Sequence, residues 1–144
     1  MEFFEALQTY YINTMSRGFV EVAGTKLDDD FFAWKEEGRT LHPEARWIIT
    51  DIKSGLALPS KEAKGAVLRF ATLKDCKEWI KAIPEEFKQK IDAAKADSHY
   101  AEACQKLADF KANLSVKESF DFMEAFEALD DIYEDELDQL TLEF

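Results

Sequence analysis

The residues of this chain that could do chemistry are mainly its acids, and they gather at one end. The last 27 residues, 118–144, carry eleven Asp and Glu and no Lys or Arg. All 18 basic residues lie in residues 1–117, where they meet the other 19 of the 30 acids. The formal charge is therefore −1 over residues 1–117 and −11 over residues 118–144, out of −12 in total. The negative charge is local.

The C-terminal stretch has the pattern of one amphipathic helix. At about 100° per residue, its apolar side chains fall within a sector of about 80°, and acids fall within about 100° on nearly the opposite side. Ser115, with Glu118 three residues later, has the pattern of a capping box and predicts where this helix begins. The apolar stripe consists of Phe122, Phe126, Leu129, Tyr133, Leu137 and Leu140. The candidate partner-binding residues are Glu124, Glu127, Asp130, Asp131, Glu134, Asp135 and Asp138.

The spacing of these acids suggests what they could bind. Between Glu124 and Asp138 a helix would carry a carboxylate about every 4 Å along its axis, close to the phosphate spacing of about 3.4 Å in one DNA strand. We therefore expect a non-enzymatic protein that binds a basic surface on another protein. In its sharpest form it is a nucleic-acid mimic that inhibits a DNA- or RNA-binding enzyme, as antirestriction and anti-CRISPR inhibitors of mobile elements do. That comparison rests on charge and size alone.

Other interpretations of the same stretch stay open. The acids could serve solubility only, or could pair with lysines of residues 74–111 in the same fold. A second class of function is a homo-oligomer or helical adaptor that acts through apolar surface, for which the unpaired terminal residues 140–144 (LTLEF) and the abundance of Phe are the motivation. A third class is a small enzyme that uses acids from the sheet region, marked by a deep pocket with two convergent carboxylates.

No motif assigns a catalytic residue, a cofactor or a metal. Residues 130–138 lack the glycine and the ligand spacing of an EF-hand loop. The two histidines, His42 and His99, and the two cysteines, Cys76 and Cys104, have no neighbours at zinc-ligand spacing. The cysteines are expected to be buried thiols. No glycine-rich phosphate loop is present among the five glycines.

Net charge and hydropathy point to the compartment and the class of partner. An acidic chain with a pI near 4.6 is repelled by phosphate, which argues against direct binding of nucleic acid or of an anionic membrane. No apolar run of 18 residues occurs, and the first residues lack a signal-peptide pattern. We therefore expect a cytoplasmic location.

The first half of the chain mixes both kinds of periodicity. Residues 2–17 repeat apolar side chains at helical spacing and end at Gly18, which predicts a helix. Residues 19–22 alternate as a strand does, and three acids at 28–30 before an apolar run predict a short helix over 29–37. Residues 46–52 and 56–58 predict a hairpin, and residues 66–70 predict a third strand.

The second half predicts helices. Thr72 with Asp75 three residues later marks a capped N-terminus, Pro84 restarts the helix, and a break is expected near residues 96–98. At 144 residues the chain is the usual size of one domain, residues 1–144. The expected fold class is α+β, with an antiparallel sheet of three to four strands in the first half. Helices cover the sheet, and a helical second half ends in the acidic amphipathic helix.

Overall fold

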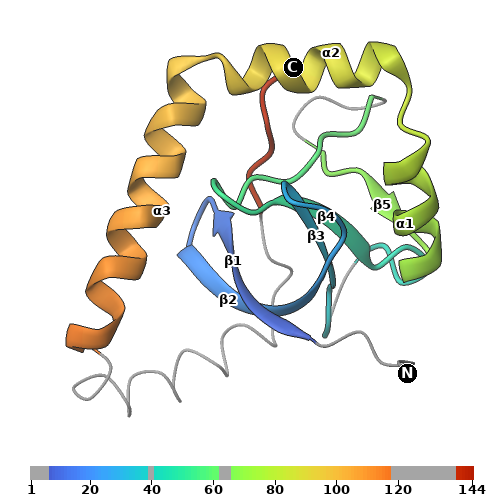
Figure 1. Cartoon of the computed structure of the whole chain (residues 1–144). Helices are drawn as coiled ribbons and strands as arrows, with labels where there is room; N and C mark the ends of the chain where they lie inside the picture. The colour runs from blue at the N-terminus through green and yellow to red at the C-terminus, as the bar shows by residue number, and fades with distance from the viewer. Residues whose placement is uncertain (1–6, 39–40, 62–65, 118–138) are drawn as a thin grey trace.

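We analysed a computed structural model that describes residues 7–38, 41–61, 66–117 and 139–144 (Figure 1). Its five strands precede its three helices, which confirms the α+β class with five strands in place of three to four. The strands are β1 (Gln8–Thr14), β2 (Gly18–Lys26), β3 (Phe31–Lys35), β4 (Trp47–Asp51) and β5 (Arg69–Phe70). The helices are α1 (Leu73–Lys81), α2 (Glu85–Lys95) and α3 (Ser98–Lys117).

The sheet is an antiparallel meander with the order β1-β2-β3-β4-β5. Its first hairpin turns at Gly18, whose φ of 68° suits a residue without a Cβ. Thr14 stabilises this turn, because its Oγ1 donates to the Gly18 carbonyl at 2.7 Å and accepts from the Arg17 N–H at 3.0 Å. Residues 56–58 pair with the end of β4, as the predicted hairpin requires.

The last residues of the chain join β1 to the segment that follows β4. We call residues 139–144 the C-terminal strap. The Leu140 N–H donates to the Asn13 carbonyl of β1 at 2.8 Å, and the Leu142 N–H donates to the Ala57 carbonyl at 2.9 Å. Because residues 56–58 also pair with β4, the strap fills the space between the first strand and this extension of the fourth. The curved sheet is thereby closed on itself by backbone hydrogen bonds (Figure 1).

Alternate side chains of the strands pack into two separate cores. Tyr10, Ile12, Phe32, Trp34 and Ile48 lie on the inner side of the curved sheet, where Tyr10 and Phe32 stack with ring centroids 4.1 Å apart. The outer side carries a second core, made with the helices. Its buried residues are Phe31, Ala33, Ile49, Leu58, Cys76, Phe87, Ile91, Ala94 and Leu142. β3 contributes to both cores, so four of its five residues are buried.

The starts of α1 and α2 and the break before α3 lie where the sequence indicates. The Asp75 N–H donates to Thr72 Oγ1 at 3.1 Å, which confirms the predicted cap of α1. Pro84 stands immediately before α2, and the break between α2 and α3 falls at residues 96–97. Among the described residues, none of the helices is long and apolar enough to cross a membrane.

The predicted helix over residues 2–17 is wrong for the part that the structure describes. Residues 8–14 form β1, and Gly18 is a hairpin turn and not a helix stop. Tyr10, Tyr11 and Ile12 are aromatic or β-branched residues that favour strands. Their three- and four-residue spacing with other apolar side chains resembled a helical face by coincidence, because both sides of β1 contact other elements.

The predicted short helix over residues 29–37 is also wrong. Residues 31–35 form β3, an apolar run that is buried on both faces and therefore lacks alternation. The three acids before it make a turn instead of a helix cap. Asp28 Oδ1 accepts the N–H groups of Asp30 and Phe31, each at 2.8 Å, as Asp side chains do in tight turns.

Three expectations for the C-terminal stretch need correction at its ends. Residues 115–117 continue α3, so Ser115 is not the N-cap of a new helix. The strap is extended and not helical, so Leu140 does not belong to a helical stripe. Residues 140–144 are also not an unpaired terminus: Leu142 is 2% exposed in the outer core, and the Phe144 ring packs edge-on against Phe87.

Candidate functional site

The predicted partner-binding residues lie outside the described part of the chain. We call residues 118–138 the acidic segment; it carries ten acids and no basic residue. The structure gives no geometry for it, so the predicted carboxylate face stays a prediction. The residues concerned are Glu124, Glu127, Asp130, Asp131, Glu134, Asp135 and Asp138.

The structure does place the two ends between which the acidic segment runs. On the N-terminal side, α3 packs against the first hairpin, because the Phe110 ring lies 5.5 Å from Tyr11 and 5.1 Å from Phe19, measured between centroids. On the C-terminal side, the chain enters the fold at Gln139, opposite Thr14 of β1. The acidic segment is thus joined at both ends to the folded body.

Gln139 anchors the second of these ends. Its side chain is buried, and its Nε2 donates to Thr50 Oγ1 at 2.9 Å and to the Gly55 carbonyl at 3.1 Å. Thr50 Oγ1 also accepts from the indole N–H of Trp34 at 3.2 Å. Gln139 therefore ties the strap to the inner core immediately after the last acid of the segment.

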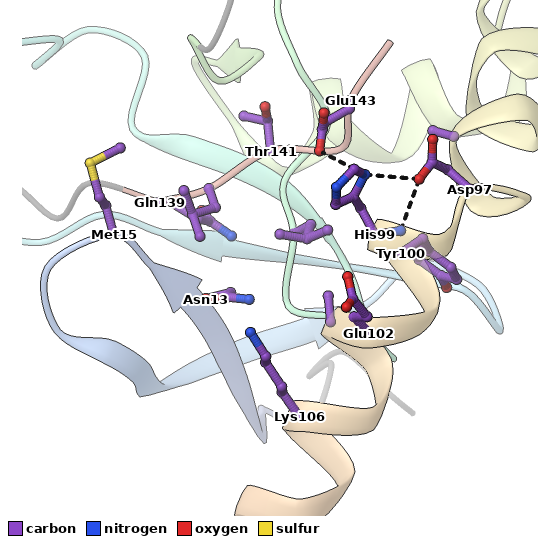
Figure 2. Close-up of a pocket in the computed structure, with 14 residues that line it drawn as sticks. Asn13, Met15, Asp97, His99, Tyr100, Glu102, Lys106, Gln139, Thr141 and Glu143 are labelled. Atoms are coloured by element: carbon purple, nitrogen blue, oxygen red, sulfur yellow. Dashed lines mark hydrogen bonds and ion pairs between the residues drawn. The ribbon is translucent and has the colours of Figure 1, made fainter.

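A groove lies beside this anchor, between the first turns of α3, β1 and the strap (Figure 2). Its volume is about 710 Å³. The residues at 99, 102, 103 and 106 occupy one face of α3, because they are spaced by three or four positions. The described lining consists of Asn13, Met15, Leu56, Ala94, Asp97, His99, Tyr100, Glu102, Ala103, Lys106, Gln139, Leu140, Thr141 and Glu143.

Two carboxylates converge on one histidine at the rim of this groove. His99 Nδ1 lies 2.9 Å from Asp97 Oδ1 and 3.9 Å from Glu143 Oε2 (Figure 2). The His99 N–H also donates to Asp97 Oδ1 at 2.8 Å, and this bond lowers the pKa of the Asp97 carboxyl. The three side chains come from the α2–α3 junction and the strap, and they are 53 to 74% exposed.

This rim is poorly arranged for acid–base catalysis. A general acid or base works with a reacting group within hydrogen-bond reach, usually in a site that excludes water. The His99 side chain is 69% exposed, and no Ser, Thr or Cys side chain in the described chain bonds to its ring. The convergent carboxylates expected of the enzyme hypothesis are present, but they come from outside the sheet region.

Asp51 lies below the groove at the centre of a buried polar network. Its Oδ2 accepts from the Ser54 N–H at 3.0 Å, from Ser54 Oγ at 2.7 Å and from the Tyr100 hydroxyl at 2.9 Å. Lys95 Nζ lies 3.2 Å from the other oxygen, Oδ1. Burial, followed by the negative charge of Asp51, raises the pKa of Tyr100 well above its usual value. The network joins β4 to α2 and α3, so its role is structural.

Sequence reasoning did not find the groove. Its walls come from segments that lie far apart in the chain, and only contact between them reveals it. The one available signal was His99 beside Asp97 just after a predicted helix break, which marks an N-terminal turn.

The prediction for the two cysteines is better supported: Cys76 is buried, Cys104 is partly buried, and neither is in a disulfide. Burial raises the pKa of Cys76 to about 12.

Comparisons with known proteins add no relative from which a function could be inferred. No protein-family model matches the chain, and neither the curated proteins nor the solved structures searched contain a significant match.

Proposed function

We propose that this protein binds another protein through its acidic segment, which occupies a basic surface of the partner. The observation that carries the proposal is the separation of charge along the chain. Residues 118–138 hold ten acids without a basic residue, whereas the rest of the chain has 20 acids and 18 bases. A surface of one charge sign steers a partner of the opposite sign and selects against like-charged ones.

The anchored ends of the acidic segment support the proposal. Because α3 and the strap are both packed on the sheet, the segment is held close to the folded body at each end. A segment tethered at both ends loses less conformational entropy on binding than a free tail of the same length. Concentrated charge on such a segment suits binding in a basic groove of the kind that binds nucleic acid, and the sharper form of the proposal is a nucleic-acid mimic.

The test is capture of a partner from host lysate by the tagged protein at low salt, followed by elution in a salt gradient. The loss variant is Glu127→Gln, Asp131→Asn, Glu134→Gln and Asp138→Asn. The matched control removes the same charges from exposed positions elsewhere: Glu21→Gln, Asp30→Asn, Glu44→Gln and Asp92→Asn. Both variants have a net charge of −8, since each removes four negative charges from a chain of net charge −12.

We expect the parent and the control to retain a partner that elutes as salt rises, and the loss variant to release it at lower salt. Exposed charges lose most of their interaction as ionic strength increases, because counter-ions screen them. The captured protein should release DNA or RNA when the parent protein is added, if the segment mimics nucleic acid. Equal loss of capture in the control, or capture that is insensitive to salt, would contradict the proposal.

A further inference from the structure

The groove beside the strap is positioned to take part in the same interaction. Asp138, the last acid of the acidic segment, is followed directly by Gln139, Leu140 and Thr141, which line the groove. A partner that lies along the segment therefore reaches the groove at its C-terminal end. At about 710 Å³ the groove is within the range of about 300–1,000 Å³ that is typical of ligand sites.

The charges at the groove favour a cation over an anion. Asp97, Glu102 and Glu143 line it, and Lys106 is the only Lys or Arg among its described residues. An anion would normally use the N–H groups that begin α3. Here Asp97 already accepts them: its side chain bonds the His99 N–H, and its carbonyl accepts the Tyr100 N–H at 3.1 Å and the Ala101 N–H at 3.4 Å.

The remaining lining fits a long basic side chain. Leu56, Ala94, Ala103 and Leu140 give the groove an apolar portion, against which the aliphatic stem of Arg or Lys can pack while its charged head meets a carboxylate. Gln139 also lines the groove, and no group in the described chain donates to its buried Oε1. Arginine and lysine carry only hydrogen-bond donors at their charged ends.

We propose that the groove binds an arginine or lysine side chain from a short basic segment of the partner protein. This inference rests on the proposed function and extends it: the partner has a basic surface that covers the acidic segment and, next to it, a basic side chain that enters the groove. Glu102 and Glu143 are the carboxylates that would bind the incoming group, because Asp97 is held by His99 at 2.9 Å whereas Glu143 lies 3.9 Å from the same ring.

The probe for this inference is the peptide acetyl-Ala-Arg-Ala-Arg-Ala-amide, titrated into the isotope-labelled full chain at low salt and followed by two-dimensional amide NMR. The control peptide has Gln in place of both Arg. We expect the arginine peptide to shift the amide signals of Asn13, Glu102 and Leu140, and the control peptide to leave them in place. The double variant Glu102→Gln and Glu143→Gln should lower the affinity of the groove for the arginine peptide about threefold to tenfold, because it removes two exposed ion pairs.

A single substitution that removes a positive charge provides a second test with the opposite expected effect. Lys106→Gln removes the cation that competes with the peptide, so the peptide should bind about twofold more tightly at the groove. Weaker binding in Lys106→Gln, or groove shifts caused by inorganic phosphate and lost in this variant, would show an anion site and overturn the inference. The spectra of both variants also report whether the fold is retained.

The outcomes separate this inference from the proposed function. If the arginine peptide shifts signals of residues 118–138 but not of the groove, the groove inference fails and the proposed function stands. If the groove responds equally to both peptides, charge is not what the groove recognises, and the inference fails. If neither region responds, the inference fails, and the absence of any response in the acidic segment also counts against the proposed function.

Discussion

Asp51 and the acidic segment show two opposite uses of acidic residues in one chain. Asp51 is 1% exposed, and its carboxylate is paired with Lys95 and bonded by Ser54 and Tyr100. Glu36 is similar, since it is 2% exposed and its Oε1 lies 2.8 Å from Arg69. The acidic segment, in contrast, has ten acids and no basic residue within it.

The difference teaches which acids serve the fold. A buried carboxylate is stable only when a counter-charge and hydrogen bonds replace the water it has lost. Asp51 has both, and it joins one strand to two helices. Acids without counter-charges repel each other and do not stabilise the fold in this way. Asp51 and Glu36 have counter-charges in Lys95 and Arg69, whereas the acidic segment has none within its own sequence.

The largest effect on the fold is expected at Asp51. Asp51→Ala should lower the free energy of unfolding by about 3–5 kcal/mol, because it leaves the Lys95 ammonium without its partner and removes three hydrogen bonds. Urea denaturation measures the change. The exposed acid Asp92, replaced by Asn, is the control and should change the free energy by less than about 0.5 kcal/mol. Equal effects at the two positions would remove the distinction between the two kinds of acid.

The next largest effect is expected at Leu142, which fixes the strap. Leu142→Ala should cost about 3 kcal/mol of unfolding free energy, because it leaves a cavity in the outer core. Leu41, which is 82% exposed, is the control, and Leu41→Ala should be nearly neutral. Thermal or urea unfolding would check both. A neutral Leu142→Ala would mean that the strap, and with it one end of the acidic segment, is not held as the structure shows.

The fall of the free energy of unfolding at alkaline pH should depend on the buried thiol of Cys76. Folding raises the pKa of Cys76 to about 12. The protonated thiol therefore adds its full stabilisation to the free energy of unfolding below the ordinary thiol pKa of 9.0, and this stabilisation is lost as pH rises toward 12. The Cys76→Ala variant should show a shallower fall of unfolding free energy between pH 9 and 12. The reduction should approach the slope of one proton, about 1.4 kcal/mol per pH unit. An unchanged slope would show that Cys76 is not protected from ionisation.

The smallest effect on stability is expected in the acidic segment itself. The test variant carries Glu127→Gln, Asp131→Asn, Glu134→Gln and Asp138→Asn. Its free energy of unfolding should be within about 0.5 kcal/mol of the parent's, or slightly higher, because these substitutions remove only charge repulsion. Urea denaturation of this variant beside Asp51→Ala compares the two kinds of acid directly. A loss of 2 kcal/mol or more, on the order of a broken buried pair, would show that these acids stabilise the fold.

Local signals in the sequence were sufficient for the starts of α1 and α2 and for the break before α3, and insufficient for the first half of the chain. Thr72 and Pro84 predict helix starts correctly, because caps act within a few residues. β3 was misread, because a strand buried on both faces has no alternation and resembles a buried helical turn. Its two faces are buried by the curvature of the sheet and by the helices, and neither is visible in residues 31–35 alone.

The candidate sites divide in the same way. The acidic segment follows from composition, which needs no structure, and its geometry stays a prediction. The groove depends on residues 13, 99 and 143, which meet only because the strap returns to β1 after the acidic segment. The strap itself resembled the end of a helix, since Leu137 and Leu140 continue the helical spacing. Backbone pairing with Asn13 and Ala57 decides its extended form.

The most direct test of the central proposal is the salt dependence of affinity for the captured partner. The dissociation constant would be measured by calorimetry at several salt concentrations for the parent, the acidic-segment variant and the matched control. We predict a steep loss of affinity with salt in the parent and the control, and weaker binding with a shallower slope in the acidic-segment variant. Identical affinities and slopes for all three proteins would contradict the proposal that the acidic segment is the binding surface.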